Sequence, residues 1–253
     1  MSPEQAEWAS GETNAGLAGL LASLPDCLQV NHPSAAHRAN SKISVLVQAQ
    51  RAGLEVPPTW IGNTPSPARA FAEQQGKVVC KSLTRPDITY DSGERSFFPT
   101  TPVPAHRINE QVAAHVHQLQ HAVEKAFEVR LTVIGRHMFA VRIDAHSTAA
   151  QADWRTDPDA RSYRVIDLPA TVRHGVAALL DHYCLRYAAL DLLVQHDGRW
   201  LLVDLNTAGQ YGWLETALPD LRISQALAAF LARHTDPAPA AEQPVHHASR
   251  PRR

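Results

Sequence analysis

The sequence predicts an α+β fold with mainly antiparallel sheets, because two stretches have the pattern of β-hairpins. Residues 188–206 carry apolar runs on both sides of Asp197-Gly198, a dipeptide typical of tight hairpin turns. Residues 128–144 carry a similar pair of runs around Gly135. Helical spacing of apolar residues over 171–187 and 223–234 predicts amphipathic helices.

Composition narrows the class of protein. A chain of 253 residues can bury a substantial core, and its net charge of −1 gives no electrostatic reason to expect a nucleic acid or a membrane surface as partner. No window reaches the run of about 18 apolar residues that a spanning helix needs, and the acidic N-terminus does not have the pattern of a secretory signal. The three cysteines are widely separated, which favours free thiols in a reducing compartment. We therefore expect a cytoplasmic protein.

The hairpin over residues 188–206 predicts a metal site. A two-residue turn at Asp197-Gly198 places Asp191 directly opposite Asp204, with Asn206 on the same face. The apolar rows on the other face are Leu190, Leu192 and Val194 opposite Leu205, Val203 and Leu201. Two carboxylates and an amide oxygen suit a hard cation, above all Mg²⁺. The alternative is a solvated polar face with a chance pair of aspartates.

The hairpin over residues 128–144 predicts an anion site. Placing its apolar rows on one face gives a three-residue loop, 135–137, and sets Arg130 opposite Arg142 on the polar face. Paired arginines there would suit a bridging phosphate or carboxylate. Two arginines splayed into water are the alternative.

Two lysines are candidates for binding an anion, and a free surface lysine is the alternative for the first, Lys42. Residues 40–53 predict a helix with Lys42 in its first turn, where the helix dipole disfavours a cation. Residues 78–81 predict a buried strand that ends at Lys81, after a strand at 56–61 and a helix at 67–75. Residues 82–108 predict a flexible loop or lid. The sequence has neither a P-loop nor a Gly-x-Gly-x-x-Gly motif.

Taken together, these segments resemble the ATP-grasp superfamily, and within it the graspetide (microviridin-type) maturases of ribosomally made peptides. The resemblance spans roughly residues 8–234, and its specific marks are residues 120–135, 139–144, Asp153-Trp-Arg155 and residues 204–215. It implies two α/β subdomains that sandwich ATP, with a precursor peptide as substrate. Such ligases phosphorylate a side-chain carboxylate of the peptide, and a Ser or Thr hydroxyl or a Lys amine then displaces phosphate to close an ester or amide ring.

The resemblance assigns roles residue by residue. Lys42 and Lys81 would hold ATP phosphates, and Arg130 and Arg142 would act as catalytic cations. Asp191, Asp204 and Asn206 would carry Mg²⁺. The remaining expected contacts are Gln120, His121, Ala122 and Val123 with adenine, Glu128 with the ribose or substrate end, and Trp154 and Arg155 with the peptide.

The resemblance also implies a domain plan, with two departures at the metal site. A remnant of an N-terminal region would occupy 1–40, a small subdomain 41–120, a large subdomain with the metal site 121–234, and a disordered tail 235–253. The chain would lack most of the N-terminal domain of the family. Asp204 stands where the family usually has Glu, and Thr207 where it has Pro.

Three functions follow as alternatives. The first is an ATP-dependent ligase that forms ω-ester or ω-amide rings in a precursor peptide. The second is an amino-acid ligase that acts on another carboxylate. The third is a degenerate ATP-grasp module that binds nucleotide or leader peptide without turnover. The sequence leaves the oligomeric state open, a homodimer included.

Overall fold

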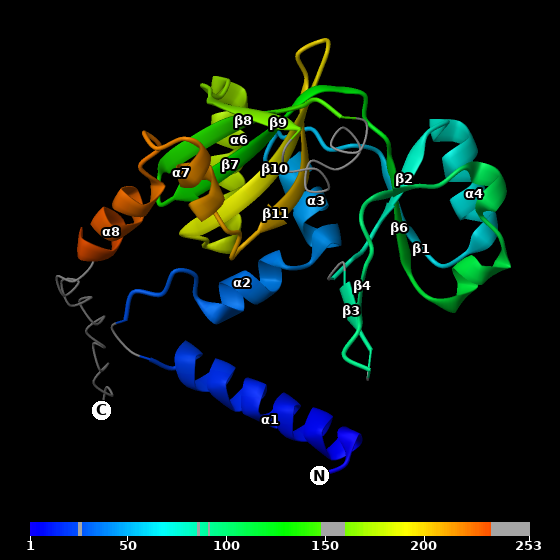
Figure 1. Cartoon of the computed structure of the whole chain (residues 1–253), viewed down its shortest axis with the longest axis horizontal. Helices are drawn as coiled ribbons and strands as arrows, with labels where there is room; N and C mark the ends of the chain where they lie inside the picture. Colours follow the sequence, from blue (N-terminus) through cyan, green and yellow to red (C-terminus); the bar gives the residue numbers. More distant parts are fainter. Residues whose placement is uncertain (25–26, 85–86, 91, 148–159, 234–253) are drawn as a thin grey trace, which may run out of the picture.

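The computed structural model describes residues 1–24, 27–84, 87–90, 92–147 and 160–233, and it confirms the predicted α+β class. Two antiparallel sheets lie side by side, each covered by helices (Figure 1). Within the described residues, no helix is both long enough and apolar enough to cross a membrane. The predicted tail at 235–253 and the predicted peptide contacts Trp154 and Arg155 lie outside the described residues.

The larger sheet has five strands in the order β11-β10-β7-β8-β9, and each neighbouring pair is antiparallel. Its strands are β7 (Lys125–Ile134), β8 (His137–Ala145), β9 (Arg161–Val165), β10 (Tyr187–Gln195) and β11 (Trp200–Asn206). The central strands β7 and β10 are buried along most of their length. This sheet therefore has a core on each of its two faces.

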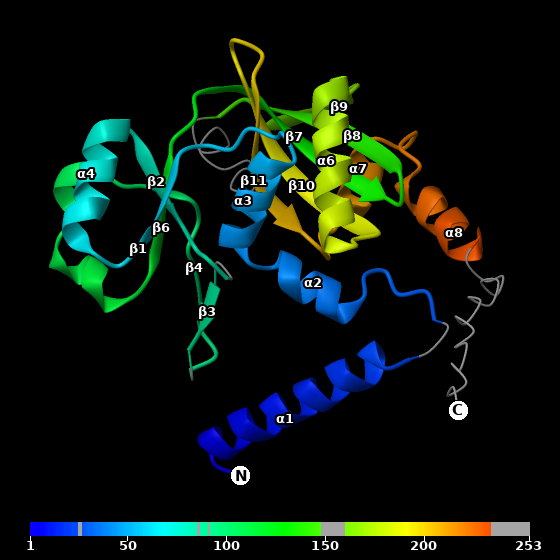
Figure 2. The same ribbon diagram turned by 180° about the vertical axis from the view of Figure 1, so that it is seen from behind.

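One face of the larger sheet packs against α6 (Ala170–Tyr183) and α3 (Lys42–Arg51), which lie next to each other across it (Figure 2). Val129, Leu131 and Leu190 from the sheet join Val176 and Leu179 of α6 in this core. A fully buried side chain of this size contributes about 1.5–3 kcal/mol, so this layer supplies much of the stability. The other face packs against α7 (Gly212–Ala217) and α8 (Ile223–Arg233) through a smaller core.

The smaller sheet has the order β1-β6-β2-β5, with β1 (Thr59–Gly62), β2 (Val78–Lys81), β5 (Thr101–Pro102) and β6 (His117–His121). Helix α4 (Pro65–Gln75) covers it, with Ala68 and Ala72 against Val78 and Leu119. The 3-10 turns η1 (Ala105–Arg107) and η2 (Glu110–Ala114) extend this layer, and β3 (Asp87–Thr89) and β4 (Arg95–Phe97) form a separate short hairpin. The segment predicted as a loop, 82–108, thus contains three short strands.

The β10–β11 hairpin confirms the pairing that predicted a metal site. Asp191 lies directly opposite Asp204, and Ala189 opposite Asn206, so both aspartates and the asparagine share one face. A bulge then shifts the register: Leu192 lies opposite Leu202 instead of Val203, and Val194 opposite Trp200 instead of Leu201. Val203 is therefore the extra residue, placed immediately before Asp204. The predicted two-residue turn is wrong, because the loop has three residues, 196–198.

The predicted register of the β7–β8 hairpin is wrong by one residue. Arg130 lies opposite Val141, and Arg142 lies opposite Val129, so the two arginines point to opposite faces of the sheet. The loop is the two-residue turn Gly135-Arg136, in which Gly135 has φ +57°. No shared anion site forms from this pair.

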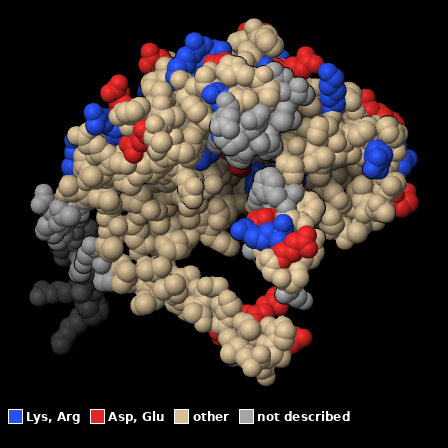
Figure 3. Space-filling view, in the orientation of Figure 1, with Lys and Arg blue, Asp and Glu red and all other residues tan. Residues whose placement is uncertain are grey.

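The N-terminal helices differ from the predicted plan. Helix α1 (Pro3–Ala22) has no buried residue and stands apart from both sheets (Figure 3). Helix α2 (Pro33–Ala39), like α7 and β9, is not in the sequence prediction; it is short and buries Ala35 and Ala39 in the core of the larger sheet. Helix α3, expected in the small subdomain, also packs its Val45 and Ala49 there.

Candidate active site

A cleft of about 870 Å³ lies between the two sheets, which is large enough for a nucleotide. Polar and charged side chains from both sheets and from the N-terminus of α3 reach it. Of the predicted site residues, ten line this cleft: Lys42, Lys81, Gln120, His121, Ala122, Val123, Glu128, Asp191, Asp204 and Asn206.

The metal candidates share one wall of the cleft. Asp191 is buried, Asp204 is half-buried and Asn206 is exposed, and the Oδ1 atom of Asn206 accepts a hydrogen bond from the amide of Ala208 at 2.9 Å. In the described part of the chain, no group of three or more His, Cys, Asp or Glu side chains has the geometry of a metal site. Two carboxylates and one amide oxygen suit Mg²⁺, which completes its octahedron with phosphate oxygens and water.

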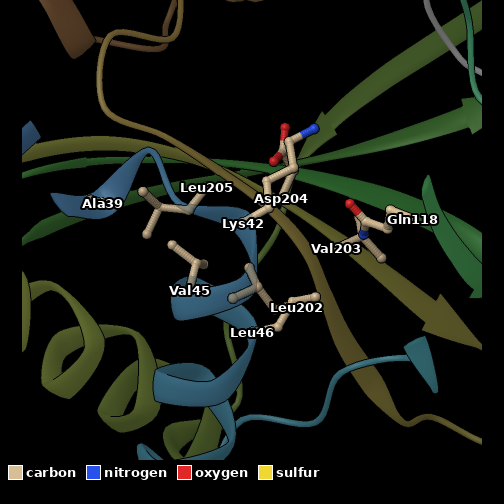
Figure 4. Close-up of a pocket in the computed structure, with 9 residues that line it drawn as sticks. All are labelled: Ala39, Lys42, Val45, Leu46, Gln118, Leu202, Val203, Asp204 and Leu205. Atoms are coloured by element: carbon tan, nitrogen blue, oxygen red, sulfur yellow. The ribbon is translucent and has the colours of Figure 1, made fainter. Parts of the chain in front are cut away.

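The two lysines cross the cleft in opposite directions. Lys42 belongs to α3, and its Nζ donates to the carbonyl of Ser82, just beyond β2, at 2.7 Å. Lys81 ends β2, and its Nζ lies 3.4 Å from the carbonyl of Val203 on β11. Figure 4 shows the polar ends of Lys42 and Asp204 at one side of a small pocket. Both ammonium groups are therefore near the carboxylate wall, where a polyphosphate and a divalent cation would bind together.

The end of β6 forms the back of the cleft. The amides of His121 and Ala122 donate to the carbonyls of Pro58 and Lys77, both at 2.9 Å, so neither amide is available to an adenine ring. Gln120 is buried; its Nε2 donates to Thr59 Oγ1 at 2.9 Å. Any backbone contact with adenine is thereby restricted to carbonyl groups here or to residues after Ala122.

Glu128 lies at the same end of the cleft. Its carboxylate accepts a hydrogen bond from Lys125 Nζ at 2.7 Å, and the two side chains are only 10% and 17% exposed. Lys125 itself lines the cleft and is absent from the sequence prediction. Its position two residues after the 120–123 segment is the signal in the sequence that could have identified it.

Comparison with known proteins decides the family. No family model matches the chain, and no curated protein matches it. Among solved structures, it is similar to the RiPP-associated ATP-grasp ligase of Chryseobacterium gregarium, solved with ADP and a leader and core peptide. That match has 30% identity and a TM-score of 0.83, and it covers 92% of this chain and 71% of that one. This chain belongs to the RiPP-associated ATP-grasp ligases.

Two further solved structures are similar to this chain. The macrocyclase MdnC of Microcystis aeruginosa, solved with the precursor peptide MdnA, has 28% identity and a TM-score of 0.82, over 92% of this chain and 73% of that one. The ATP-grasp ligase PsnB, complexed with a minimal precursor, has 20% identity and a TM-score of 0.76 over the same shares, which is a likeness of fold alone.

In this ligase, Arg130 is buried next to the cleft but does not line it. Its Nη1 donates to Asp191 Oδ1 at 2.8 Å, both side chains are 8% exposed, and its Nη2 lies 3.4 Å from the carbonyl of Gln210. The loop after β11 covers it: a Cβ on Gly209 would lie 2.6 Å from the Arg130 guanidinium. The predicted catalytic residue Arg130 is therefore a buried partner of Asp191, one of the candidate metal ligands.

Arg142 lies on the opposite face of the sheet, outside the cleft lining. Its Nε donates to Asp144 at 2.8 Å, and its guanidinium stacks 3.8 Å over the centre of the Phe127 ring. The opposed-arginine arrangement that suggested a catalytic role for it is absent, because the one-residue register difference turns its side chain away. A direct part in catalysis stays a prediction without geometric support.

Two asparagines that the sequence did not single out support the wall formed by Asp191, Asp204 and Asn206, called here the candidate metal wall. Asn31 makes four hydrogen bonds: its Oδ1 accepts from the amides of Arg186 and Tyr187 at 2.7 and 2.9 Å, and its Nδ2 donates to the carbonyls of Tyr187 and Thr207 at 2.7 and 3.0 Å. Thr207 Oγ1 also lies 3.3 Å from Asn40 Oδ1. The segment preceding α3 thus fixes the residue that follows Asn206.

Proposed function

We propose that this ligase activates a side-chain carboxylate of a precursor peptide with ATP and joins it to a Ser or Thr hydroxyl or a Lys amine of the same peptide. The carboxylate oxygen attacks the γ-phosphorus of ATP, and ADP leaves. The hydroxyl or amine then attacks the acyl carbon, phosphate leaves with the oxygen, and the nucleophile gives up its proton. The observation that carries the proposal is the cleft in which two lysines face an oxygen-rich wall of Asp191, Asp204 and Asn206.

The protein would act by positioning and by charge, without a nucleophile of its own. Lys42 and Lys81 would exchange their carbonyl partners for phosphate oxygens. Asp191, Asp204 and Asn206 would hold Mg²⁺, which neutralises phosphate charge and fixes the orientation of the chain of phosphates. Glu128 and Lys125 would contact the ribose or the peptide at the other end of the cleft.

Asp204 is one methylene shorter than the Glu expected from the family resemblance, and the bulge at Val203 offers a compensation. An extra residue bends the strand locally and re-aims the side chain that follows. Here the extra residue, Val203, immediately precedes Asp204, and its carbonyl oxygen lies 3.4 Å from Lys81 Nζ. We infer that this local bend advances the shorter carboxylate into the cleft.

The substrate is proposed to be a peptide with a leader and a core rich in Thr and in Glu or Asp. Trp154 and Arg155 remain the predicted contacts for it. Cys27, Cys80 and Cys184 are all free thiols, which supports a reducing compartment and, with it, a cytoplasmic location where ATP is abundant.

The test is turnover of a peptide encoded beside the ligase. Purified protein, Mg²⁺-ATP and the peptide are incubated, and mass spectrometry follows the loss of one water per ring alongside ADP release. Asp204→Asn should abolish ring formation, because it removes one of the two carboxylate charges that would hold Mg²⁺. The same change at the exposed Asp220 should leave the rate unchanged.

Two other results would contradict the proposal, and each supports a different alternative function. If the protein binds ATP but leaves the mass of the peptide unchanged, and Asp204→Glu restores nothing, the chain is a binding module and not a ligase. If it ligates a free amino acid to the peptide instead, mass increases, and the amino-acid ligase alternative holds.

A further inference from the structure

A second large cleft lies at the far end of the larger sheet, where no predicted site residue is found. Its volume is about 850 Å³, and it is bounded by the β7–β8 turn, the α6–β10 connection and one side of α8. Strand β7 connects the two clefts: Glu128 lines the first and Gly135 the second. Seven residues of extended strand span about 23 Å, so the two clefts are separate sites.

Arginine dominates the rim of this second cleft, which we name the arginine groove. Arg136, Arg186, Arg222 and Arg233 line it, all exposed, with Asp181 as the one acid among the lining residues. Asp181 is already paired with Arg136 at 2.9 Å. Within the part of the chain that the structure describes, no ion pair engages the other three arginines. The hydrogen bond from Ser224 lowers the pKa of the Glu215 carboxyl group most, and the charge of Arg222 lowers it slightly further.

The floor of the arginine groove is apolar. Ala226, Ala229 and Phe230 of α8 present one wall, and Leu185 the other. The Phe230 ring lies close against the β7–β8 turn: a Cβ on Gly135 would meet it at 2.8 Å. An occupant must therefore offer an apolar group to the floor and negative charge to the rim.

These features distinguish among classes of partner. A nucleic acid backbone would follow a continuous basic track, whereas here four arginines surround an apolar floor and the whole chain has a net charge of −1. A carboxylate-bearing peptide meets both requirements, negative charge for the rim and an apolar group for the floor. Arginine guanidinium groups bind carboxylates in a bidentate manner, and a peptide also supplies apolar side chains. Such rim charges steer and orient a partner more than they add affinity.

We propose that the arginine groove binds an acidic segment of a peptide, with its carboxylates on Arg186 and Arg222 and an apolar side chain against Phe230. If that peptide is the precursor, which rests on the proposed function, about seven extended residues are the least that can connect this segment to the reacting cleft. Binding itself needs neither ATP nor turnover.

The experiment measures binding alone, so its failure is distinct from a failure of the ligase activity. A fluorescein-labelled peptide that alternates glutamate with leucine is titrated with the full chain, and anisotropy gives the Kd. The double variant Arg186→Glu, Arg222→Glu should weaken binding by about tenfold or more. Arg173→Glu, an equal charge reversal at an exposed position on α6 outside the groove, should leave Kd within about twofold.

Four outcomes would overturn the proposal. These are no measurable binding of the peptide, equal losses in the groove and control variants, preferential binding of a labelled single-stranded RNA that the groove variants abolish, and a change of oligomeric state in the double variant. The last would make a second copy of this chain the occupant. Thermal unfolding of both variants checks that they fold, as is expected for exposed side chains, and Arg222→Gln gives a milder variant for the same titration.

Discussion

Replacing Asn31 with alanine tests how the N-terminal segment supports the candidate metal wall. The side chain uses both of its donor hydrogens and both lone pairs, and it joins the start of β10 to the residue after Asn206. Three of the four bonds are partly buried, and the fourth involves an exposed amide that water can satisfy. At about 1 kcal/mol for each partly buried bond, the loss is about 3 kcal/mol of the free energy of unfolding.

For a chain of this size, that loss corresponds to a fall in Tm of roughly 6–12 °C. Asn14→Ala is the matched control, because it makes the same chemical change on α1, which has no buried residue; its effect should stay within about 0.5 kcal/mol. Calorimetry measures both. A fall in Tm of less than about 2 °C for Asn31→Ala, or one equal to that of the control, would refute the assignment.

A second measurement separates positioning from plain stability. Asn31→Ala frees the Thr207 carbonyl next to Asn206, so the Mg²⁺ concentration that half-saturates ADP binding should rise, as measured by isothermal titration at a temperature where the variant is folded. If stability falls and the Mg²⁺ dependence stays unchanged, Asn31 supports the fold alone.

Three further predictions follow from the same region and from β6. Gly209→Ala should lower Tm and weaken Mg²⁺-ADP binding, because the new Cβ would lie 2.6 Å from the Arg130 guanidinium. Gly212→Ala has open space around it and should change neither Tm nor binding. Arg130→Met should cost about 3–5 kcal/mol, because it removes the cation that is paired with the buried Asp191 carboxylate. Added Mg²⁺ should raise the Tm of this variant more than that of the native protein, and equal shifts would contradict the proposed metal site. Burial, followed by the charge of a neighbouring histidine, lowers the pKa of His117 below its ordinary value of 6.5. The folded state then binds fewer protons, so the stability that His117 confers is complete above pH 6.5 and is lost as pH falls through the lower folded pKa. In His117→Gln, the denaturant midpoint should therefore depend less on pH between pH 7 and 5, and an unchanged dependence would count against this.

The predicted pairing of Asp191 with Asp204 is confirmed, but two one-residue departures cancel to produce it. The loop is one residue longer than the predicted two-residue turn, and the bulge at Val203 then restores the predicted register at the two aspartates. The bulge at Val203 was not predictable, because Leu201, Leu202 and Val203 are all apolar and alternation does not say which of them is the extra residue.

The register of β7 and β8 failed for a physical reason. β7 is buried on both faces, so alternation of apolar residues does not say which row faces which core. The burial of Arg130 under the loop after β11 depends on residues about eighty positions away, and no local pattern reports it. Helix α2 was missed because its seven residues are stabilised by burying Ala35 and Ala39, not by their own propensity.

The crossed lysines have a mechanical consequence. Lys42 is attached to the core of the larger sheet and bonds to a carbonyl beyond β2, whereas Lys81 is attached to the smaller sheet and bonds to a carbonyl of β11. Each lysine is therefore attached to one sheet and its helices and hydrogen-bonds to the other. An anion that binds both ammonium groups breaks both hydrogen bonds at once and becomes a single ligand shared by the two sheets. The spacing of the two sheets is then set by the length of the bound polyphosphate, so ATP and ADP should leave the enzyme in measurably different degrees of closure.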